Sequence, residues 1–400
     1  MSSQRPVGEP RPAHATSAAA VREARAPARA EVIGSLLRPR RLLDALAAVY
    51  PPDHMMAFAE DRARDRSELD AVADEEIRRV VGRQVDIGLD VVTDGEFRRL
   101  LFTNSLQDAV DGLEPGSKGR IFRTPGGQEF ETPPIPVVSA RLRKAVSPAA
   151  REAAFLAAIT DHPFKVSLPA GSWFLLPENF VPGVTDRFYA SAEELFEDML
   201  AIQRELIADA IAAGARYVQL DFPRYVHLLN EDSRAAIRAA GADPDDFFER
   251  ALDADRRVIE GFPGDVTFGL HICRGNFRSA WLHEGSLEPV AERLFNELPY
   301  DVFLVEWEDV SREGDYAPLR HVPEGPIVVL GAVSSKVPEV ESEDDVVRAL
   351  EAASRFVDLD RLAISTQCGF ASDAQGNLLS EDDQWRKVDL VARVADRIWR

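Results

Sequence analysis

Short apolar runs rich in β-branched residues alternate along this chain with longer segments of helical periodicity. Apolar runs of this length, bounded by turn residues, predict buried β-strands. We expect eight strands, which begin at residues 31, 90, 165, 217, 267, 302, 326 and 362 with the sequences EVIGSL, DVVTDGE, KVSLP, YVQLDFP, TFGLHIC, VFLVEW, PIVVLGAV and LAISTQCGF. Eight buried strands alternating with helices predict an α/β protein with a single (β/α)8 TIM barrel over residues 31–400. A doubly wound open sheet is the alternative, but no Gly-rich dinucleotide fingerprint follows the first strand.

Two of the connections have features of their own. Residues 191–215 carry apolar positions at three- and four-residue spacing, and Ser191 followed by Glu194 has the spacing of a capping box, so we expect a helix that ends at Gly214. The connection from 101 to 164 is long for one barrel loop. We expect an inserted β-hairpin there beside the barrel mouth, between the second and third strands, followed by a helix near 148–160. The acidic run at 339–345 predicts the solvated start of another helix.

Composition narrows the class of protein. Residues 1–30 are rich in Ala, Arg and Pro without apolar periodicity, which predicts a disordered tail that the fold does not need. No apolar stretch reaches the roughly 18 residues of a membrane helix. The net charge of −21 disfavours nucleic acid and anionic membranes as partners. Two cysteines far apart are too few for a disulfide framework, so we expect a cytoplasmic protein.

Polar residues gather at the C-terminal ends of the predicted strands, where a barrel places its chemistry. His271 and Cys273 end the fifth strand, two residues apart and hence on one side of it. A chance pair in a core strand is the alternative, since buried cysteines are commonly inert. Glu306 ends the sixth strand and Cys368 the eighth, which favours metal ligation. One histidine, two thiolates and a carboxylate form a set that suits tetrahedral Zn²⁺.

The proportion of sulfur ligands indicates what such a metal would do. Two thiolates leave zinc electron-rich, so we expect it to hold a substrate thiolate rather than to ionise water. A metal-bound thiol is deprotonated near neutral pH and becomes a ready nucleophile. The Glu306 carboxylate could be displaced when the substrate thiol arrives.

Two carboxylates follow other strands and are candidate catalytic groups. Glu96 comes after the second strand and Asp221 ends the fourth. Either side chain could bind an amino group of the substrate or position water. The alternative for each is a structural carboxylate paired with an arginine such as Arg98 or Arg99.

Two further rim residues are candidates for substrate binding. Trp173 follows the third strand, where it is either a stacking platform for the substrate or part of the barrel wall. Arg274 directly follows Cys273. Its guanidinium either binds an acidic substrate or neutralises the acidic rim.

Six motifs occur in the order VIGSLLRP, VVTDGEFRR, VQLDFPRY, GLHICRGN, FLVEWED and STQCGF. Over roughly residues 31–400 they resemble the catalytic barrel of the cobalamin-independent methionine synthases. The resemblance implies a zinc cofactor and two groups of site residues. The implied metal ligands are His271, Cys273, Glu306 and Cys368, and the implied binding residues for the amino acid thiol substrate are Ser35, Glu96 and Asp221.

The chain also departs from the family pattern. Full-length members carry a second, N-terminal barrel that helps to bind polyglutamylated folate, and only the tail stands there in this chain. The family's Asp-Glu-Pro reads Asp221-Phe222-Pro223, and Val333 stands where a catalytic histidine is expected. These departures argue against methyltetrahydrofolate and homocysteine as substrates. They leave the zinc–thiolate chemistry intact. The sequence is more similar to single-barrel relatives, which include epoxyalkane:coenzyme M transferase.

We therefore expect a zinc-dependent thiol methyltransferase or alkyltransferase, similar to the enzymes of methionine biosynthesis. Homocysteine with a methyl donor, or another small thiol with an epoxide-like or other alkyl donor, would be its substrates, and it could form a homo-oligomer. A metal-dependent lyase or hydrolase that activates water is the alternative, although hydrolytic zinc sites more often use His and carboxylate ligands. A purely structural zinc site would draw its ligands from one local stretch, whereas these come from separate strand ends.

Overall fold

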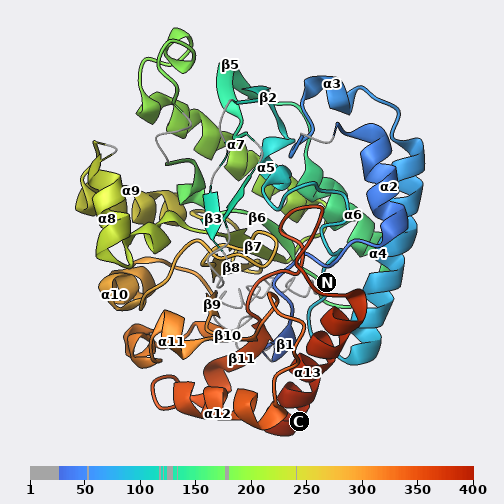
Figure 1. Cartoon of the computed structure of the whole chain (residues 1–400), viewed down its shortest axis with the longest axis vertical. Helices are drawn as coiled ribbons and strands as arrows, with labels where there is room; N and C mark the ends of the chain where they lie inside the picture. The colour runs from blue at the N-terminus through green and yellow to red at the C-terminus, as the bar shows by residue number, and fades with distance from the viewer. Residues whose placement is uncertain are drawn as a thin grey trace, which may run out of the picture.

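A curved parallel sheet forms the centre of the protein (Figure 1). The computed structural model describes residues 27–400, apart from 52–53, 117–118, 120, 124–128, 133, 176–179 and 240. Seven strands pair in the order β1–β11–β10–β9–β8–β7–β6, so the first strand lies beside the last. Their bounds are β1 (Ala30–Glu31), β6 (Val166–Pro169), β7 (Tyr217–Asp221), β8 (Thr267–Ile272), β9 (Val302–Glu306), β10 (Ile327–Val333) and β11 (Leu362–Thr366).

The second predicted strand closes the sheet into a barrel. Val91 forms a parallel bridge with Glu31 of β1, and Val92 forms one with Phe164, just ahead of β6. The pairing stays this short because the chain turns soon afterwards, at Gly95, whose φ is 71°. β-structure therefore occurs in all eight predicted places, and the predicted (β/α)8 barrel is confirmed.

Helices surround the barrel (Figure 1). The predicted capped helix is α7 (Ala192–Ala212): the Ser191 hydroxyl accepts a hydrogen bond from the Glu194 N–H at 3.2 Å. The Glu194 carboxylate accepts from the Ala190 N–H rather than from Ser191, so only half of the expected capping box forms. The other α-helices are α2 (Arg40–Val49), α3 (Ala59–Arg62), α4 (Ser67–Ile87), α5 (Asn104–Gln107), α6 (Pro148–Ile159), α8 (Glu231–Ala239), α9 (Pro244–Arg257), α10 (Glu288–Glu297), α11 (Val310–Glu313), α12 (Glu343–Ala353) and α13 (Glu381–Trp399). Short 3-10 helices span Gly171–Leu175, Thr185–Arg187, Arg224–Leu228, Ala317–His321 and Leu359–Arg361.

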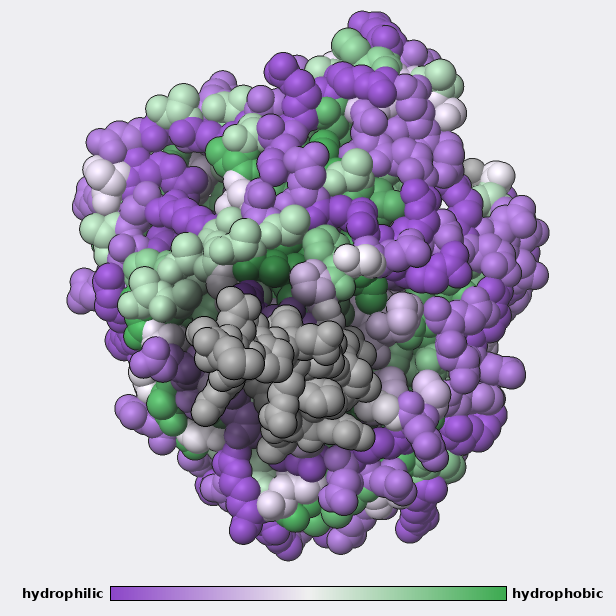
Figure 2. Space-filling model, turned by 180° about the vertical axis from the view of Figure 1, so that it is seen from behind, coloured by the Kyte–Doolittle hydropathy of each residue, from purple (hydrophilic) through white to green (hydrophobic). Residues whose placement is uncertain are grey.

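The helices bury one apolar face against the sheet. In α13, Leu390, Val391 and Val394 are fully buried. Complete burial of a side chain of this kind contributes about 1.5–3 kcal/mol. The outward face of the helical layer carries the charged residues, and the side of the molecule seen in Figure 2 is accordingly mostly hydrophilic.

The long connection after the second strand is built as predicted. It contains the antiparallel pair β2 (Val110–Glu114) and β5 (Val137–Lys144), a second antiparallel pair formed by β3 (Ile121–Arg123) and β4 (Glu129–Glu131), and then α6. At its start, Leu101 forms an antiparallel bridge with Asp373, which follows β11. The inserted segment therefore begins at the C-terminal rim of the barrel.

The start of the barrel differs from the predicted boundary at residue 31. Ala30 already belongs to β1. The backbone N–H of Arg29 donates to Asp90 at 2.7 Å, and its guanidinium donates to the carbonyl of Leu362 at 2.7 Å. The predicted tail up to residue 26 lies outside the described residues. Among the helices of the described part of the chain, none is long and apolar enough to cross a membrane.

Candidate metal centre

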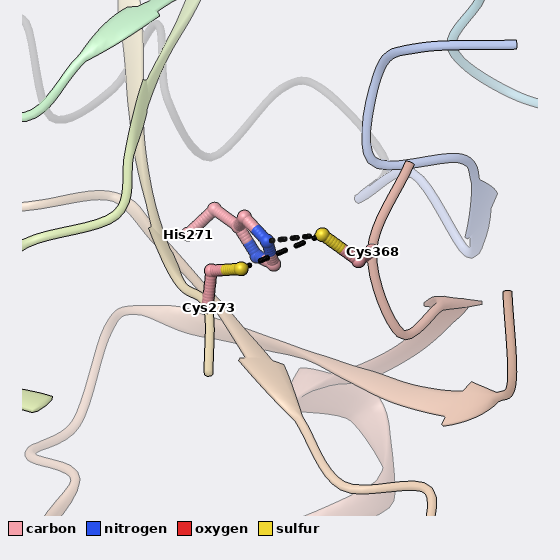
Figure 3. Close-up of side chains that lie close together, drawn as sticks. All are labelled: His271, Cys273 and Cys368. Carbon is pink, nitrogen blue, oxygen red and sulfur yellow. Dashed lines mark hydrogen bonds between the residues drawn. The ribbon is translucent and has the colours of Figure 1, made fainter. Parts of the chain in front are cut away.

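Three of the predicted metal ligands come together at the C-terminal rim of the barrel. His271 lies in β8, Cys273 follows this strand, and Cys368 follows β11. Figure 3 shows their side chains pointing toward one another. The Sγ of Cys368 lies 3.5 Å from the Sγ of Cys273 and 3.7 Å from the Nε2 of His271. All three side chains are buried, so the barrel encloses a cluster of one nitrogen and two sulfur donors.

Backbone geometry fixes the two cysteines. The chain turns directly after β8, and the N–H of Cys273 donates to the carbonyl of His271 at 3.1 Å. The side-chain amide of Asn276 donates to the carbonyl of Gly369 at 2.7 Å. Because Gly369 follows the second cysteine, this bond ties the loop after β8 to the loop after β11. Hydrogen bonds within the protein therefore hold the site together across the barrel mouth.

The two thiols ionise differently. The hydrogen bond from Cys273 lowers the pKa of Cys368 well below its ordinary value, and His271 helps, while burial opposes the shift. The same hydrogen bond, together with burial, raises the pKa of Cys273. Burial works to lower the pKa of His271, but Cys368 and Asp221 raise it on balance. A cluster that already favours one thiolate is suited to a cation.

A tetrahedral zinc ion fits the observed separations. Zinc–sulfur bonds of about 2.3 Å and zinc–nitrogen bonds of about 2.0 Å place two sulfurs about 3.8 Å apart, and a sulfur and a nitrogen about 3.5 Å apart. The protein holds its sulfurs at 3.5 Å and the Cys368 sulfur and His271 nitrogen at 3.7 Å. Each separation agrees within a few tenths of an ångström, so the donor set and its geometry both suit zinc.

Glu306, the fourth predicted ligand, stands apart from these donors. Among the described residues, the donor atoms within 4.8 Å of one another are those of His271, Cys273 and Cys368, and Glu306 instead groups with Glu308 and Glu313. Hydrogen bonds explain why Glu306 is not grouped with the other three donors, because cationic and backbone donors contact both of its carboxylate oxygens. These donors are the Arg274 N–H at 2.8 Å, Lys336 Nζ at 3.1 Å and the Arg312 guanidinium at 3.3 Å.

The acidic group at the end of β9 is an ion-pair network. The Arg312 guanidinium lies 2.7 Å from Glu308 and 2.6 Å from Glu313. The ammonium of Lys336 lies 3.5 Å from Glu308. Two buried cations thus balance most of the charge of three carboxylates, and the group needs no metal ion for compensation.

The two other predicted carboxylates are buried at the same rim. The Ser167 hydroxyl donates to the Oε1 of Glu96 at 2.9 Å, whereas its Oε2 has no hydrogen-bond donor among the described residues. The side-chain amide of Gln219 donates to Asp221 at 2.7 Å. Burial raises the pKa of Asp221 to about 7, with Glu96 adding to the shift while His271 opposes it. Burial also raises the pKa of Glu96. Burial disfavours the charged form of both carboxylates, and a cationic ligand would compensate that cost.

The expected arginine pairing of Glu96 is weak. Arg99 lies 3.6 Å from the Glu96 carboxylate but 2.5 Å from Glu152, which is its main partner. Arg98 pairs with Asp74 instead. Glu96 also holds a left-handed backbone with φ 58°, which is uncommon for a residue other than glycine and costs about 1–3 kcal/mol. Such a cost at a buried carboxylate favours a functional position over a structural one.

Ser35 is tied to the segment that carries the second cysteine. Its hydroxyl oxygen accepts from the Ala371 N–H at 3.3 Å, and its carbonyl accepts from the Phe370 N–H at 2.8 Å. A Cβ at Gly369 would stand 2.0 Å from the Ser35 hydroxyl oxygen, so only glycine allows this approach. The ends of β1 and β11 are thereby locked together beside Cys368.

The contacts of Trp173 and Arg274 fit the structural alternatives considered for them, and a role in substrate binding stays a prediction for both. Trp173 is buried in a 3-10 helix, its carbonyl accepts from Arg224 at 3.0 Å, and the Arg224 guanidinium lies 5.1 Å from its ring centroid. These contacts are those of a barrel wall. Arg274 is fully buried, and its guanidinium donates to the carbonyl of Gly285. Burial lowers the pKa of Arg274, and the nearby carboxylates Glu313 and Glu306 oppose the shift.

Lys336 is a buried residue at the rim that the sequence patterns did not identify. Val333, considered as the replacement of a catalytic histidine, is the fully buried last residue of β10. Lys336 stands three residues later and contacts Glu306. A charged residue just beyond the end of a barrel strand is the signal that could have identified it.

Comparison with known proteins gives a consistent result. The family described as cobalamin-independent synthase, catalytic domain, matches residues 53–381. The chain is 34% identical over 385 residues to the uncharacterized protein YxjH of Bacillus subtilis strain 168, covering 95% of this chain and 97% of that protein. A solved structure from Listeria monocytogenes, assigned to the vitamin-B12-independent methionine synthases, superposes with a TM-score of 0.68 at 27% identity over 94% of this chain and 99% of its own. A B12-independent methionine synthase from Shewanella sp. W3-18-1 shares the fold, with a TM-score of 0.69, 22% identity and coverage of 92% and 97%. This chain therefore belongs to the family of cobalamin-independent synthase catalytic domains.

Proposed function

We propose that this protein is a zinc-dependent transferase that activates a small thiol for attack on a methyl or alkyl donor. The triangle of His271, Cys273 and Cys368 carries the proposal, because the two separations that involve the Cys368 sulfur match those of a tetrahedral zinc site. Three protein ligands leave one position for a substrate. Zinc in this site would hold a substrate thiol as the thiolate near neutral pH.

The proposed reaction is a displacement at carbon. The acceptor sulfur forms a bond to the methyl or alkyl carbon as the bond from that carbon to the leaving group breaks. The leaving group takes the bonding electron pair, and the thiol proton passes to solvent or to the leaving group. The rim residues bind and orient the acceptor, and burial of the site excludes competing water.

The carboxylates favour an acceptor that carries an amino group. Glu96 and Asp221 are buried beside the metal centre, and each holds incompletely neutralised charge when ionised. An ammonium group would satisfy both, whereas the sulfonate of coenzyme M would face repulsion there. We therefore propose an amino acid thiol such as homocysteine as the acceptor. Methyltetrahydrofolate polyglutamate is not our proposed donor, because Phe222 and Val333 replace family residues.

The metal content tests the first step of the proposal. The purified protein should hold about one zinc per chain, and elemental analysis of Cys273→Ser and Cys368→Ser should show its loss. His321→Ala is a matched control, because His321 is a partly exposed histidine that contacts Glu288 outside the site. Wild-type zinc in both serine variants would show that the metal site is assigned wrongly.

Cobalt substitution tests thiol binding. Entry of a substrate thiolate should change the sulfur-to-cobalt charge-transfer band, and a panel of homocysteine, cysteine, coenzyme M and other small thiols should rank homocysteine first. No spectral response to any thiol would favour water activation or a structural metal. Rapid methionine formation from homocysteine and methyltetrahydrofolate polyglutamate would contradict the proposed donor and indicate an orthodox methionine synthase.

A further inference from the structure

Left-handed backbone at residues other than glycine gathers near the mouth of the barrel. In the described part of the chain, these residues are Glu96, Phe222, Arg278 and Ser279. Glu96 belongs to the proposed binding site for the acceptor, and Phe222 directly follows Asp221. Residues held in this strained conformation cluster at active sites and ligand clamps. Arg278 and Ser279 carry the same strain without an assigned role.

Arg278 and Ser279 stand at the tip of a tight turn in the loop after β8. The Phe277 N–H donates to the Ala280 carbonyl at 3.0 Å, and the Ala280 N–H donates back to the Phe277 carbonyl at 2.9 Å. A turn with two left-handed central residues normally has glycine, asparagine or aspartate there. The loop after β11 holds this turn, because the Ser279 N–H donates to the Asn377 side chain at 2.9 Å. Surrounding contacts therefore impose the strain, which argues for a functional demand on the turn.

The guanidinium of Arg278 is held at the rim of the barrel. Its Nε lies 3.3 Å from the carboxylate of Asp373, the residue that bridges to Leu101 at the rim. Its central carbon lies 5.1 Å from the centroid of the Phe277 ring. The side chain is 39% exposed, and its terminal nitrogens, Nη1 and Nη2, have no protein partner among the described residues. Two adjacent N–H groups of this kind match a carboxylate or a phosphate, so Arg278 offers a preorganised edge to an anion.

Asp373 only partly balances the charge of Arg278, because a second arginine lies beside it. Arg38 donates to the Asp373 carbonyl at 3.2 Å. Burial raises the pKa of the Asp373 carboxyl, while Arg278 and Arg38 oppose the shift. Two guanidinium groups therefore share one carboxylate whose charged form burial disfavours. Arg278 thus keeps positive charge at the mouth of a protein whose net charge is −21.

The exposure of Arg278 suits the donor better than the acceptor. Glu96 and Asp221, the carboxylates proposed for the ammonium of the acceptor, are buried. The acceptor therefore fills the inner end of the site, and the part of the donor that does not react must extend toward the mouth.

We infer that Arg278 binds an anionic group, a carboxylate or a phosphate, on the methyl or alkyl donor. The assignment to the donor rests on the proposed function, whereas anion binding by Arg278 does not. Contacts to a part of the donor that does not react would orient the reacting carbon toward the acceptor sulfur.

Protection from phenylglyoxal tests anion binding in the full-length protein. Phenylglyoxal modifies accessible arginines, and mass spectrometry measures the rate at each one. Inorganic phosphate and glutarate serve as probes: at about ten times its dissociation constant, either should slow modification of Arg278 by about tenfold, because only the unbound fraction reacts. Arg250 on α9 is the matched control, since its half-exposed side chain also contacts one carboxylate, that of Glu193. Protection of neither arginine, or equal protection of both, would overturn the inference.

Two thiols distinguish the donor from the acceptor as the source of the anion. In the cobalt form, Arg278→Gln should bind homocysteine and 3-aminopropane-1-thiol, which lacks the carboxylate, as tightly as the wild type does. A loss of about tenfold or more for homocysteine alone, the effect of a missing charged hydrogen bond, would assign the anion to the acceptor and overturn the inference. No thiol response in the wild type would overturn the proposed function and the assignment to the donor, whereas protection of Arg278 would still establish the anion site.

Discussion

Carboxylates at one rim take different roles because their neighbours differ. Glu306 is surrounded by Lys336 and Arg312, so its charge is already compensated. Asp221 has the amide of Gln219 as its hydrogen-bond donor, and burial raises its pKa to about 7. An incoming cation therefore gains more from Asp221 than from Glu306. This difference rests on contacts between residues far apart in the sequence, and residue type alone does not reveal it.

The pKa of Asp221 predicts how binding of an amino thiol depends on pH. The pKa is raised above the ordinary value to about 7, so the carboxylate gains a proton as the pH falls through 7, and binding an ammonium must then displace that proton. Homocysteine affinity should fall below pH 7 by up to about tenfold per pH unit relative to 4-mercaptobutyrate, which lacks the amino group. Comparing the two thiols removes the pH dependence that both share from ionisation of sulfur.

Asp221→Asn should abolish this difference in pH dependence and lower homocysteine affinity at pH 8, while leaving 4-mercaptobutyrate within about threefold, since a charged hydrogen bond is worth about 1.5–3 kcal/mol. Cobalt charge-transfer titrations measure both affinities. Equal losses for the two thiols would mean that Asp221 does not contact the amino group.

At the level of elements, the barrel could be predicted from the sequence because buried parallel strands form continuous apolar runs. Six strands of the sheet and helix α7 lie within their predicted runs, whereas β1 begins one residue ahead of its run and ends at the first residue of that run. The strand predicted from residue 90 is reduced to two bridges, because the chain turns at Gly95 soon after them. The contact between Lys336 and Glu306 was also hidden, because it depends on how neighbouring strands end and how their loops run. Local patterns thus identified three side chains that cluster at the rim, but not the ion pairs that place Glu306 in a different group.

Gly331 in β10 shows how strand packing controls the site. It pairs with Glu306 on one side and Ser365 on the other, and a Cβ there would stand 2.8 Å from the Cα of Gln367 and 3.0 Å from the carbonyl of Val305. Backbone atoms cannot move aside cheaply, so Gly331→Ala should destabilise the protein by about 1–3 kcal/mol. It should also weaken zinc binding, because Gln367 directly precedes Cys368, a proposed metal ligand.

Urea unfolding and chelator competition measure the two effects of Gly331→Ala. Gly82→Ala is the control: Gly82 lies in the interior of α4, and a Cβ there would meet no atom within 4 Å. Because alanine favours a helix over glycine by about 1 kcal/mol, this variant should be more stable than the wild type with unchanged zinc affinity. Two alanine variants of equal stability would contradict the packing argument.

At the scale of the whole molecule, the first strand of the barrel pairs with the last, close to the C-terminal residue Arg400. β1 has only two residues, and Ala30 pairs with Ile364 of β11. Near the other end of the chain, the guanidinium of Arg400 contacts Asp90, whose carboxylate also accepts the Arg29 N–H at 2.7 Å. A few residues therefore join the first strand to the last, and Cys368 lies just beyond this junction.

The junction predicts a sharp difference between two N-terminal deletions. Removing residues 1–26 leaves Arg29 and Ala30 in place, so the melting temperature and zinc content should match the full chain. Removing residues 1–30 deletes the Arg29 contacts with Asp90 and Leu362 and the pairing of Ala30 with Ile364. At least six hydrogen bonds involve Arg29 or Ala30, and their loss, at about 1 kcal/mol each, should lower the melting temperature by several degrees or more. Zinc affinity should fall as well, because β11 positions Cys368.

Arg29→Ala in the full chain distinguishes the effect of losing the Arg29 side-chain contacts from the effect of removing the whole N-terminal segment. It removes the guanidinium bond to Leu362 but keeps the backbone bond to Asp90, so its melting temperature should lie between those of the two deletions. Calorimetry and elemental analysis give both readouts. A deletion of residues 1–30 as stable and as zinc-loaded as the deletion of residues 1–26 would show that the barrel closes without its first strand, and that the metal centre does not depend on the seam between β1 and β11.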